Sequence, residues 1–216
     1  MQPSTPSRRA PMPRALLVAL ATLAASAAPA AAAELTIPPG SLQLVEFESE
    51  APVENIRGLS TEARGTVTFD PANPGTARGE VRVPVASLRT GNTTRDEDLR
   101  GQGWLDGAGH PELVFVVDAL DGVSGPVAPD APVAGRLRGR LTIKGVTRSI
   151  EVPVKLAWLL ASDKLKRAYI PGNALRVKGQ LEVRLADFDI HPPDHILGVK
   201  VADTVTVRFA LTALEK

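Results

Sequence analysis

Apolar and polar residues alternate with period two along most of the chain after residue 41, which is the pattern of half-buried antiparallel β-strands. In these segments valine, leucine and isoleucine occupy every second position, and charged residues or threonine lie between them. Proline, glycine and asparagine separate the segments, as in residues 70–75 and 144–147. The pattern predicts about eight strands, at residues 42–47, 66–69, 80–85, 113–117, 136–143, 150–158, 175–185 and 204–211.

Strands of this number and length close most naturally into a barrel, because closure leaves no exposed sheet edge. A barrel that spans an outer membrane shows the same alternation, but its apolar face points to lipid between two girdles of aromatic residues. This chain has only two Trp, one Tyr and five Phe, and the polar positions of its strands are rich in arginine and lysine. The sequence therefore favours an all-β fold, an eight-stranded antiparallel barrel whose apolar face points inward.

One stretch, residues 90–115, interrupts the alternation. Asn92 or Thr93 can cap a helix, and the acidic residues that follow lie near the positive end of its dipole. Gly101 ends that helix after about two turns, since glycine is common just past a helix end. The barrel is thus expected to carry a short helical insertion.

Residues 1–33 have the features of an export signal rather than of folded structure. An arginine-containing start precedes an apolar run over residues 15–28, and three alanines at 31–33 fit a cleavage site. The apolar run is shorter than the roughly 20 residues that a membrane-spanning helix needs. We predict a signal peptide at 1–33, a single barrel domain at 34–216, no membrane span, and a periplasmic or secreted location.

Composition narrows the chemistry. The absence of cysteine excludes disulfides, thiolate metal ligands and a cysteine nucleophile. The chain carries 25 Lys and Arg against 24 Asp and Glu, and this near balance argues against a nucleic-acid partner. The sequence leaves open whether the chain forms a homodimer.

Five motifs lie at residues 69–74, 85–92, 95–99, 110–115 and 141–147. In this order and at similar spacing they resemble the YceI-like family, of which this chain is identified as a divergent member. The resemblance implies a lipocalin-like barrel that is exported and holds a long polyisoprenoid or similar lipid in its interior.

The sequence departs from the family pattern at polar positions. Asp98 stands where relatives often have histidine, residues 187–189 read Asp-Phe-Asp instead of Asp-Phe-Gly, and residues 45–57 contain no histidine. Polar contacts to a lipid head group are therefore not carried over from the family.

Two sets of polar residues suggest chemistry at first sight. His191 and His195 flank Asp194, but the two prolines between the histidines forbid the helix that would make this spacing useful to a metal. Asp96 or Asp98 with His110 would be the acid and base of a hydrolase, although carboxylates at a helix start more often serve the helix itself. We expect no metal, no cofactor and no enzymatic activity.

The hypothesis that we favour is a lipid-binding protein that sequesters or carries an isoprenoid or fatty-acyl chain in the barrel. The alternatives are a structural or interaction barrel with a filled core and, less favoured, the hydrolase. Trp104 and the helix would form a lid over one end, and Trp158 would line the interior, unless both are simply core. The predicted lipid-binding residues are Phe69, Val83, Leu99, Trp104, Phe115, Ile143, Val154, Trp158, Val183 and Phe209.

Overall fold

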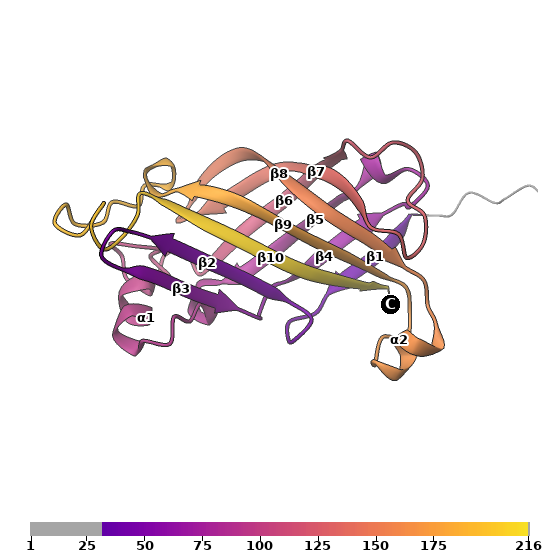
Figure 1. Ribbon diagram of the computed structural model, residues 1–216, viewed down its shortest axis with the longest axis horizontal. Helices are drawn as coiled ribbons and strands as arrows, with labels where there is room; N and C mark the ends of the chain where they lie inside the picture. The colour runs from indigo at the N-terminus through magenta and orange to yellow at the C-terminus, as the bar shows by residue number, and fades with distance from the viewer. Residues whose placement is uncertain (1–31, 216) are drawn as a thin grey trace, which may run out of the picture.

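The structure, a computed structural model, describes residues 32–215 (Figure 1). The predicted signal peptide lies outside the described residues except for its last two. The strands are β1 (Ala33–Ile37), β2 (Leu44–Glu50), β3 (Asn55–Ser60), β4 (Arg64–Phe69), β5 (Arg78–Pro84), β6 (Glu112–Asp121), β7 (Val133–Ile143), β8 (Val146–Leu159), β9 (Ala174–Arg184) and β10 (Thr204–Glu215). The helices are α1 (Thr93–Arg100) and α2 (Asp163–Arg167), with 3-10 turns η1 (Pro74–Thr76), η2 (Val85–Ser87) and η3 (Leu185–Phe188).

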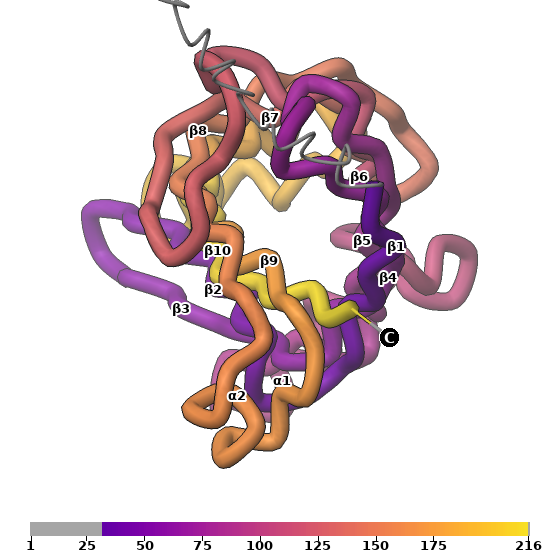
Figure 2. Tube along the Cα trace, turned by 90° about the vertical axis from the view of Figure 1, so that its right-hand side faces the viewer, coloured from indigo at the N-terminus to yellow at the C-terminus, as the bar shows by residue number. Residues whose placement is uncertain are grey.

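The strands form one closed antiparallel barrel. From β4 to β10 each strand pairs with the next in the chain, and β1 closes the ring because it pairs with both β4 and β10. Figure 2, which looks at the barrel from one end, shows the strands as a ring around a central axis. The predicted eight-stranded antiparallel barrel with one short helical insertion, α1, is confirmed.

Two of the eight positions around the ring are broken strands, which the sequence pattern did not reveal. β10 pairs along one edge first with β2, at residues 206–210, and then with β1, at residues 214–215. β1 and β2 thus share one position of the ring. β3 and β4 share the next position, because β3 pairs with β2 and β4 pairs with β1. The prediction therefore found β2 and β4 to β10 but missed β1 and β3, which are short and extend the first two positions of the ring.

The side chain of Gln43 bridges the break between β1 and β2. It is 1% exposed, and its Nε2 donates to the carbonyl oxygens of Pro38 at 2.9 Å and Thr212 at 3.0 Å. Its Oε1 accepts from the Thr212 backbone N–H at 2.9 Å. Because buried backbone groups must find partners, this amide replaces the ladder hydrogen bonds that the interruption removes.

The interior contains two hydrophobic clusters, one at each end of the barrel. We call the end that contains Phe69, Leu120 and Trp158 the base, and the end next to α1, which contains Leu105 and Val201, the mouth. Helices α1 and α2 lie at opposite ends of the barrel in Figure 1. The alternation that predicted the strands thus supplies two clusters, and Val81 and Leu181 pack against both of them.

Glycines make room for the aromatic side chains of the interior. Three phenylalanine rings lie over glycines on neighbouring strands, so a Cβ at any of these glycines would fall less than 3.0 Å from the ring. The rings are therefore held flat against the wall instead of projecting across the barrel. The pairs are Phe47 with Gly58, Phe115 with Gly139, and Phe209 with Gly179.

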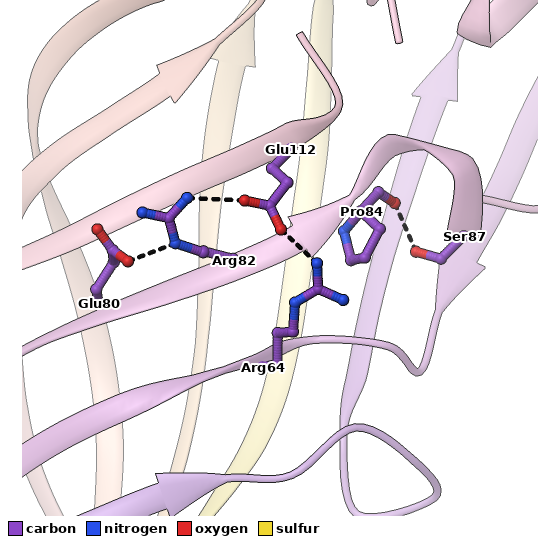
Figure 3. Close-up of polar contacts among 6 residues, drawn as sticks. All are labelled: Arg64, Glu80, Arg82, Pro84, Ser87 and Glu112. Carbon is purple, nitrogen blue, oxygen red and sulfur yellow. Dashed lines mark hydrogen bonds and ion pairs between the residues drawn. The ribbon is translucent and has the colours of Figure 1, made fainter. Parts of the chain in front are cut away.

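The outer wall is tied together by ion pairs across strands (Figure 3). Glu112 on β6 accepts from Arg82 on β5 at 2.7 Å and from Arg64 on β4 at 2.5 Å, and Arg82 also contacts Glu80. The Arg82 guanidinium, with Arg64 beside it, holds the pKa of Glu112 below its usual range. This outer face is a solvated, charged surface that leaves the apolar positions to the interior.

Candidate functional site

The middle and base of the barrel enclose an apolar chamber of about 180 Å³, which we call the inner chamber. Every residue that lines it is alanine, valine, leucine, isoleucine or phenylalanine. Several of these side chains, among them Val67, Leu137 and Phe209, are only partly buried although they point into the barrel. The interior is therefore not completely filled by its own side chains.

A second cavity of about 410 Å³, the outer chamber, lies at the mouth between the strands, α1 and the loop after β9. Its wall is apolar on the barrel side, but polar side chains at its rim include Glu54, Thr94, Arg95, Asp98 and Lys200. This arrangement places apolar surface deep in the barrel and polar groups near its entrance.

The two chambers lie end to end. Five apolar residues from five different strands line both of them, so the boundary between the chambers is a shared ring of side chains. Together they form a tunnel that runs from the mouth toward the base. The shared residues are Val45, Leu113, Ile143, Val183 and Val207.

Helix α1 covers the mouth, and local hydrogen bonds fix its start. Asn92 is the cap, since its side-chain oxygen accepts from the Arg95 backbone N–H at 3.1 Å. Asp96 is 5% exposed and accepts from both the backbone N–H and the hydroxyl of Thr90, each at 2.7 Å. The Thr90 hydroxyl bond keeps the pKa of Asp96 below its usual value. The helix thereby presents Leu99 and the following Trp104 to the outer chamber.

An ion pair connects α1 to the barrel wall beside it. Arg95 Nη2 lies 2.5 Å from Glu54 Oε1, and the two side chains are 33% and 35% exposed. Glu54 directly precedes β3, whose ladder partner is β2 on one edge, while its other edge makes one bridge, from Leu59 to Arg89. Helix α1 thus closes the mouth at the place where the strand ladder is least complete.

The hairpin of β2 and β3 is held to the barrel by Glu48. Its carboxylate accepts from Arg57 on β3 at 2.7 Å and from Arg208 on β10 at 2.8 Å. With Asn55 these hydrogen bonds, Arg208 first, lower the pKa of Glu48 from 4.5 to about 2. At the tip of the hairpin, the backbone N–H of Val53 donates to the Val199 carbonyl at 3.0 Å, which ties the hairpin to the loop after β9.

Of the ten residues predicted to bind lipid, eight line the tunnel. Leu99 and Trp104 lie in the outer chamber, and Ile143 and Val183 lie at the shared ring. The inner chamber has the other four, Phe69, Val83, Phe115 and Phe209. Contact of these residues with a ligand stays a prediction.

Val154 and Trp158 are placed differently from what we expected. Both are buried, at 4% and 5% exposure, in the hydrophobic cluster of the base, and neither lines a chamber. The Trp158 ring instead packs against Phe69, with centroids 5.7 Å apart. The alternation places both side chains inside the barrel but does not show which inward side chains face empty space, since Val152 and Leu156, on either side of Val154 on β8, do line the inner chamber.

Sequence reasoning also missed residues of the mouth. Ile190, Ile196 and Val201 line the outer chamber from the loop between β9 and β10, where no strand periodicity marks them. Val45 and Leu113 have the interior phase of their strands and could have been found from the period of two. The loop residues have no such signal, because only the folded chain brings them over the barrel.

The polar residues considered for catalysis do not converge. His110 lies against the turn at Gly145 and has Asp106 as its nearest carboxylate, at 4.0 Å, while Asp96 is bonded to Thr90. Within residues 32–215 no hydrogen bond joins His110 to Asp96 or Asp98, and no group of His, Asp and Glu has the arrangement of a metal site. Across this part of the chain, no helix is both long and apolar enough to span a membrane.

Comparison with known proteins finds a matching family model and relatives by sequence. The family model described as the YceI-like domain matches residues 31–213. A UPF0312 protein of Pseudomonas syringae pv. syringae is 32% identical over 137 residues, which cover 62% of this chain and 68% of the relative. Protein YceI of Escherichia coli O6:H1 is 31% identical over 99 residues, 46% of this chain and 48% of the relative.

Solved structures share the fold. BcnA of Burkholderia cenocepacia has a TM-score of 0.62 at 22% identity, over 79% of this chain and 95% of its own. A polyisoprenoid binding domain from Saccharophagus degradans has a TM-score of 0.62 at 14% identity, over 86% of this chain and 99% of its own. At these identities the likeness concerns the barrel itself.

Proposed function

The chain belongs to the YceI-like family, and we propose that it is an exported, non-enzymatic protein that binds one long hydrophobic chain, isoprenoid or fatty-acyl, in the tunnel. The observation that carries the proposal is the inner chamber, whose wall contains no polar side chain. Such a site binds by the apolar area that it removes from water, which favours a long chain over a compact polar molecule.

The outer chamber supports an amphiphilic ligand whose chain enters first. Leu99 and Trp104 offer apolar surface on the inner side of the lid, and Lys200, Asp98 and Thr94 surround the entrance. A polar head left at the mouth keeps its contact with water and with these side chains, so its desolvation cost stays small.

A carrier role is favoured over catalysis because, within the described residues, no hydrogen bond joins His110 to Asp96 or Asp98, and two polar groups of α1 already have structural partners. Asp96 is bonded to Thr90, and Arg95 is paired with Glu54. The alternative of a purely structural barrel predicted an exposed apolar patch at residues 113–117. Leu113, Phe115 and Val117 instead line the inner chamber, and the outward Val116 lies between Glu80 and Arg140 on the neighbouring strands.

The test is to identify what the protein holds when it is purified from its own host. Native mass spectrometry of the intact protein, followed by organic extraction, should show one apolar chain per barrel. A matched variant, Val183→Phe, places a ring at the boundary of the two chambers and should lose the bound chain while it keeps its fold. Protein that carries no apolar molecule, and that binds none when offered, would contradict the proposal.

A further inference from the structure

The inner chamber ends at a pair of aromatic side chains. Phe69 is 1% exposed and lines the chamber, whereas Trp158, 5% exposed, lies against Phe69 and outside the chamber. Their ring centroids are 5.7 Å apart and their planes are inclined by 43°. Phe69 is on β4 and Trp158 on β8, which are four positions apart in the ring of eight and therefore face each other across the barrel.

The far side of this pair is closed by the loop between β6 and β7. The Asp130 backbone N–H donates to the Trp158 carbonyl at 2.8 Å, and the Val127 N–H donates to the Pro71 carbonyl at 2.7 Å. Val127 is 5% exposed and belongs to the same hydrophobic cluster as both rings. The loop therefore connects the two opposite sides of the base and holds Trp158 from below.

We propose that Phe69 and Trp158 form the floor of the tunnel and determine the longest chain that the protein can bury. This inference rests on the proposed function, since it assumes that a chain enters from the mouth. The two residues are then specificity-determining: Phe69 contacts the chain end, and Trp158 positions Phe69.

The floor gives the dependence of affinity on chain length a definite form. Each additional methylene that is buried in the tunnel tightens binding about fourfold. A chain whose end has reached Phe69 can bury no further methylene, so longer chains should gain nothing. The limit, defined as the chain length at which this gain stops, reports the height of the floor.

The residues around the floor allow the limit to be moved in both directions. Trp158→Leu replaces a large ring by a smaller apolar side chain, so Phe69 can move down and the limit should shift to longer chains. Ala77 is 3% exposed and lines the inner chamber. The β4–β5 register places Ala77 beside Phe69, so Ala77→Leu fills chamber space next to the floor, and the limit should shift to shorter chains.

The experiment measures the dissociation constants of a homologous series of straight-chain fatty acids by calorimetry, for the delipidated wild type and the two variants. Thr206→Leu is the control, because Thr206 lies on the outer face of β10 and lines neither chamber, so the substitution should leave the limit where it is. Opposite shifts in Trp158→Leu and Ala77→Leu support the floor, and Ala77→Leu alone is sufficient if Trp158→Leu does not fold.

Two other outcomes are distinguishable from each other. If the wild type binds the series but its limit is the same in both floor variants, the floor is elsewhere and this inference is wrong while the proposed function stands. If no member of the series binds to the wild type, the proposed function fails and the inference fails with it.

Discussion

The two ends of the barrel are closed by different physical means. The base is closed by apolar packing, in which Phe69 and Trp158 meet across the barrel over the buried Val127. The mouth also has a hydrophobic cluster, but its cover, α1, is joined to the barrel wall by polar contacts at partly exposed positions, such as the Arg95–Glu54 pair. Buried apolar packing is lost only when the fold is lost, whereas partly exposed polar contacts open locally at a small cost in free energy. The tunnel therefore has a base that stays closed as long as the protein is folded and a mouth that can open locally.

Truncation of the tryptophan at each end of the barrel should give the largest difference in stability between the base and the mouth. Trp158→Ala should lower the free energy of unfolding by about 3–5 kcal/mol, because it removes a fully buried ring. Trp104→Ala should cost less than half as much, since Trp104 is partly exposed over the outer chamber. Urea denaturation followed by circular dichroism measures both. Equal losses would show that the mouth is as firmly packed as the base.

The second prediction tests whether a bound chain reaches past the boundary between the two chambers. Val183→Phe adds a ring to the shared boundary, which should cost about 1–3 kcal/mol of stability through overpacking and weaken binding of a long fatty acid about tenfold or more. Thr206→Phe adds the same ring to the outer face of β10 and is the control. If the two variants bind the fatty acid equally well, the inner chamber does not take part in binding.

The third prediction concerns the opening of the mouth by movement of α1. Arg95→Ala removes the pair with Glu54 and should change stability by about 1 kcal/mol or less, since both side chains are about one-third exposed to solvent. Release of a bound fluorescent fatty acid, followed by stopped flow, should become up to about fivefold faster. The double variant Glu54→Arg/Arg95→Glu restores the attraction and should return the rate toward that of the wild type. Release from Arg95→Ala that is no faster than release from the wild type would mean that the chain leaves by another route.

The smallest expected effect is a response of the mouth to acid. The pKa of Glu48 is depressed from 4.5 to about 2 by Arg208, Asn55 and Arg57. Its stabilising contribution is therefore complete above pH 4.5 and is lost as the pH falls through about 2. Hydrogen exchange of the β3 amides should accelerate across this range before that of β8. In Glu48→Gln the acceleration should be absent; its persistence would assign the acid response to another group.

Several elements could be predicted from the sequence because a local rule specifies them. The alternation located eight of the strands, and the Lys144–Gly145 turn joins β7 to β8 with both residues at positive φ. The helical insertion followed from its cap and its terminal glycine, and the structure selects Asn92 as the cap. Each of these features depends on contacts within a few residues.

Other elements could not be predicted because distant contacts create them. β1 and β3 are short. The break between β1 and β2 is bridged by Gln43, which bonds to the backbone of Thr212, 169 residues away in the chain. The lining of the mouth by Ile196 and Val201 depends on a loop that folds back over the barrel. No period or spacing marks such residues.

The sequence by itself determined the barrel and which side chains point inward, since a period of two fixes the face of every strand residue. Only the tertiary structure decided how far the interior is hollow. Trp158 has the same inward phase as Val183 and Ile143, yet Trp158 belongs to the solid base and the other two line the tunnel. The physical reason is that a cavity depends on what the opposite wall contributes at the same height, and strand order and register set that height.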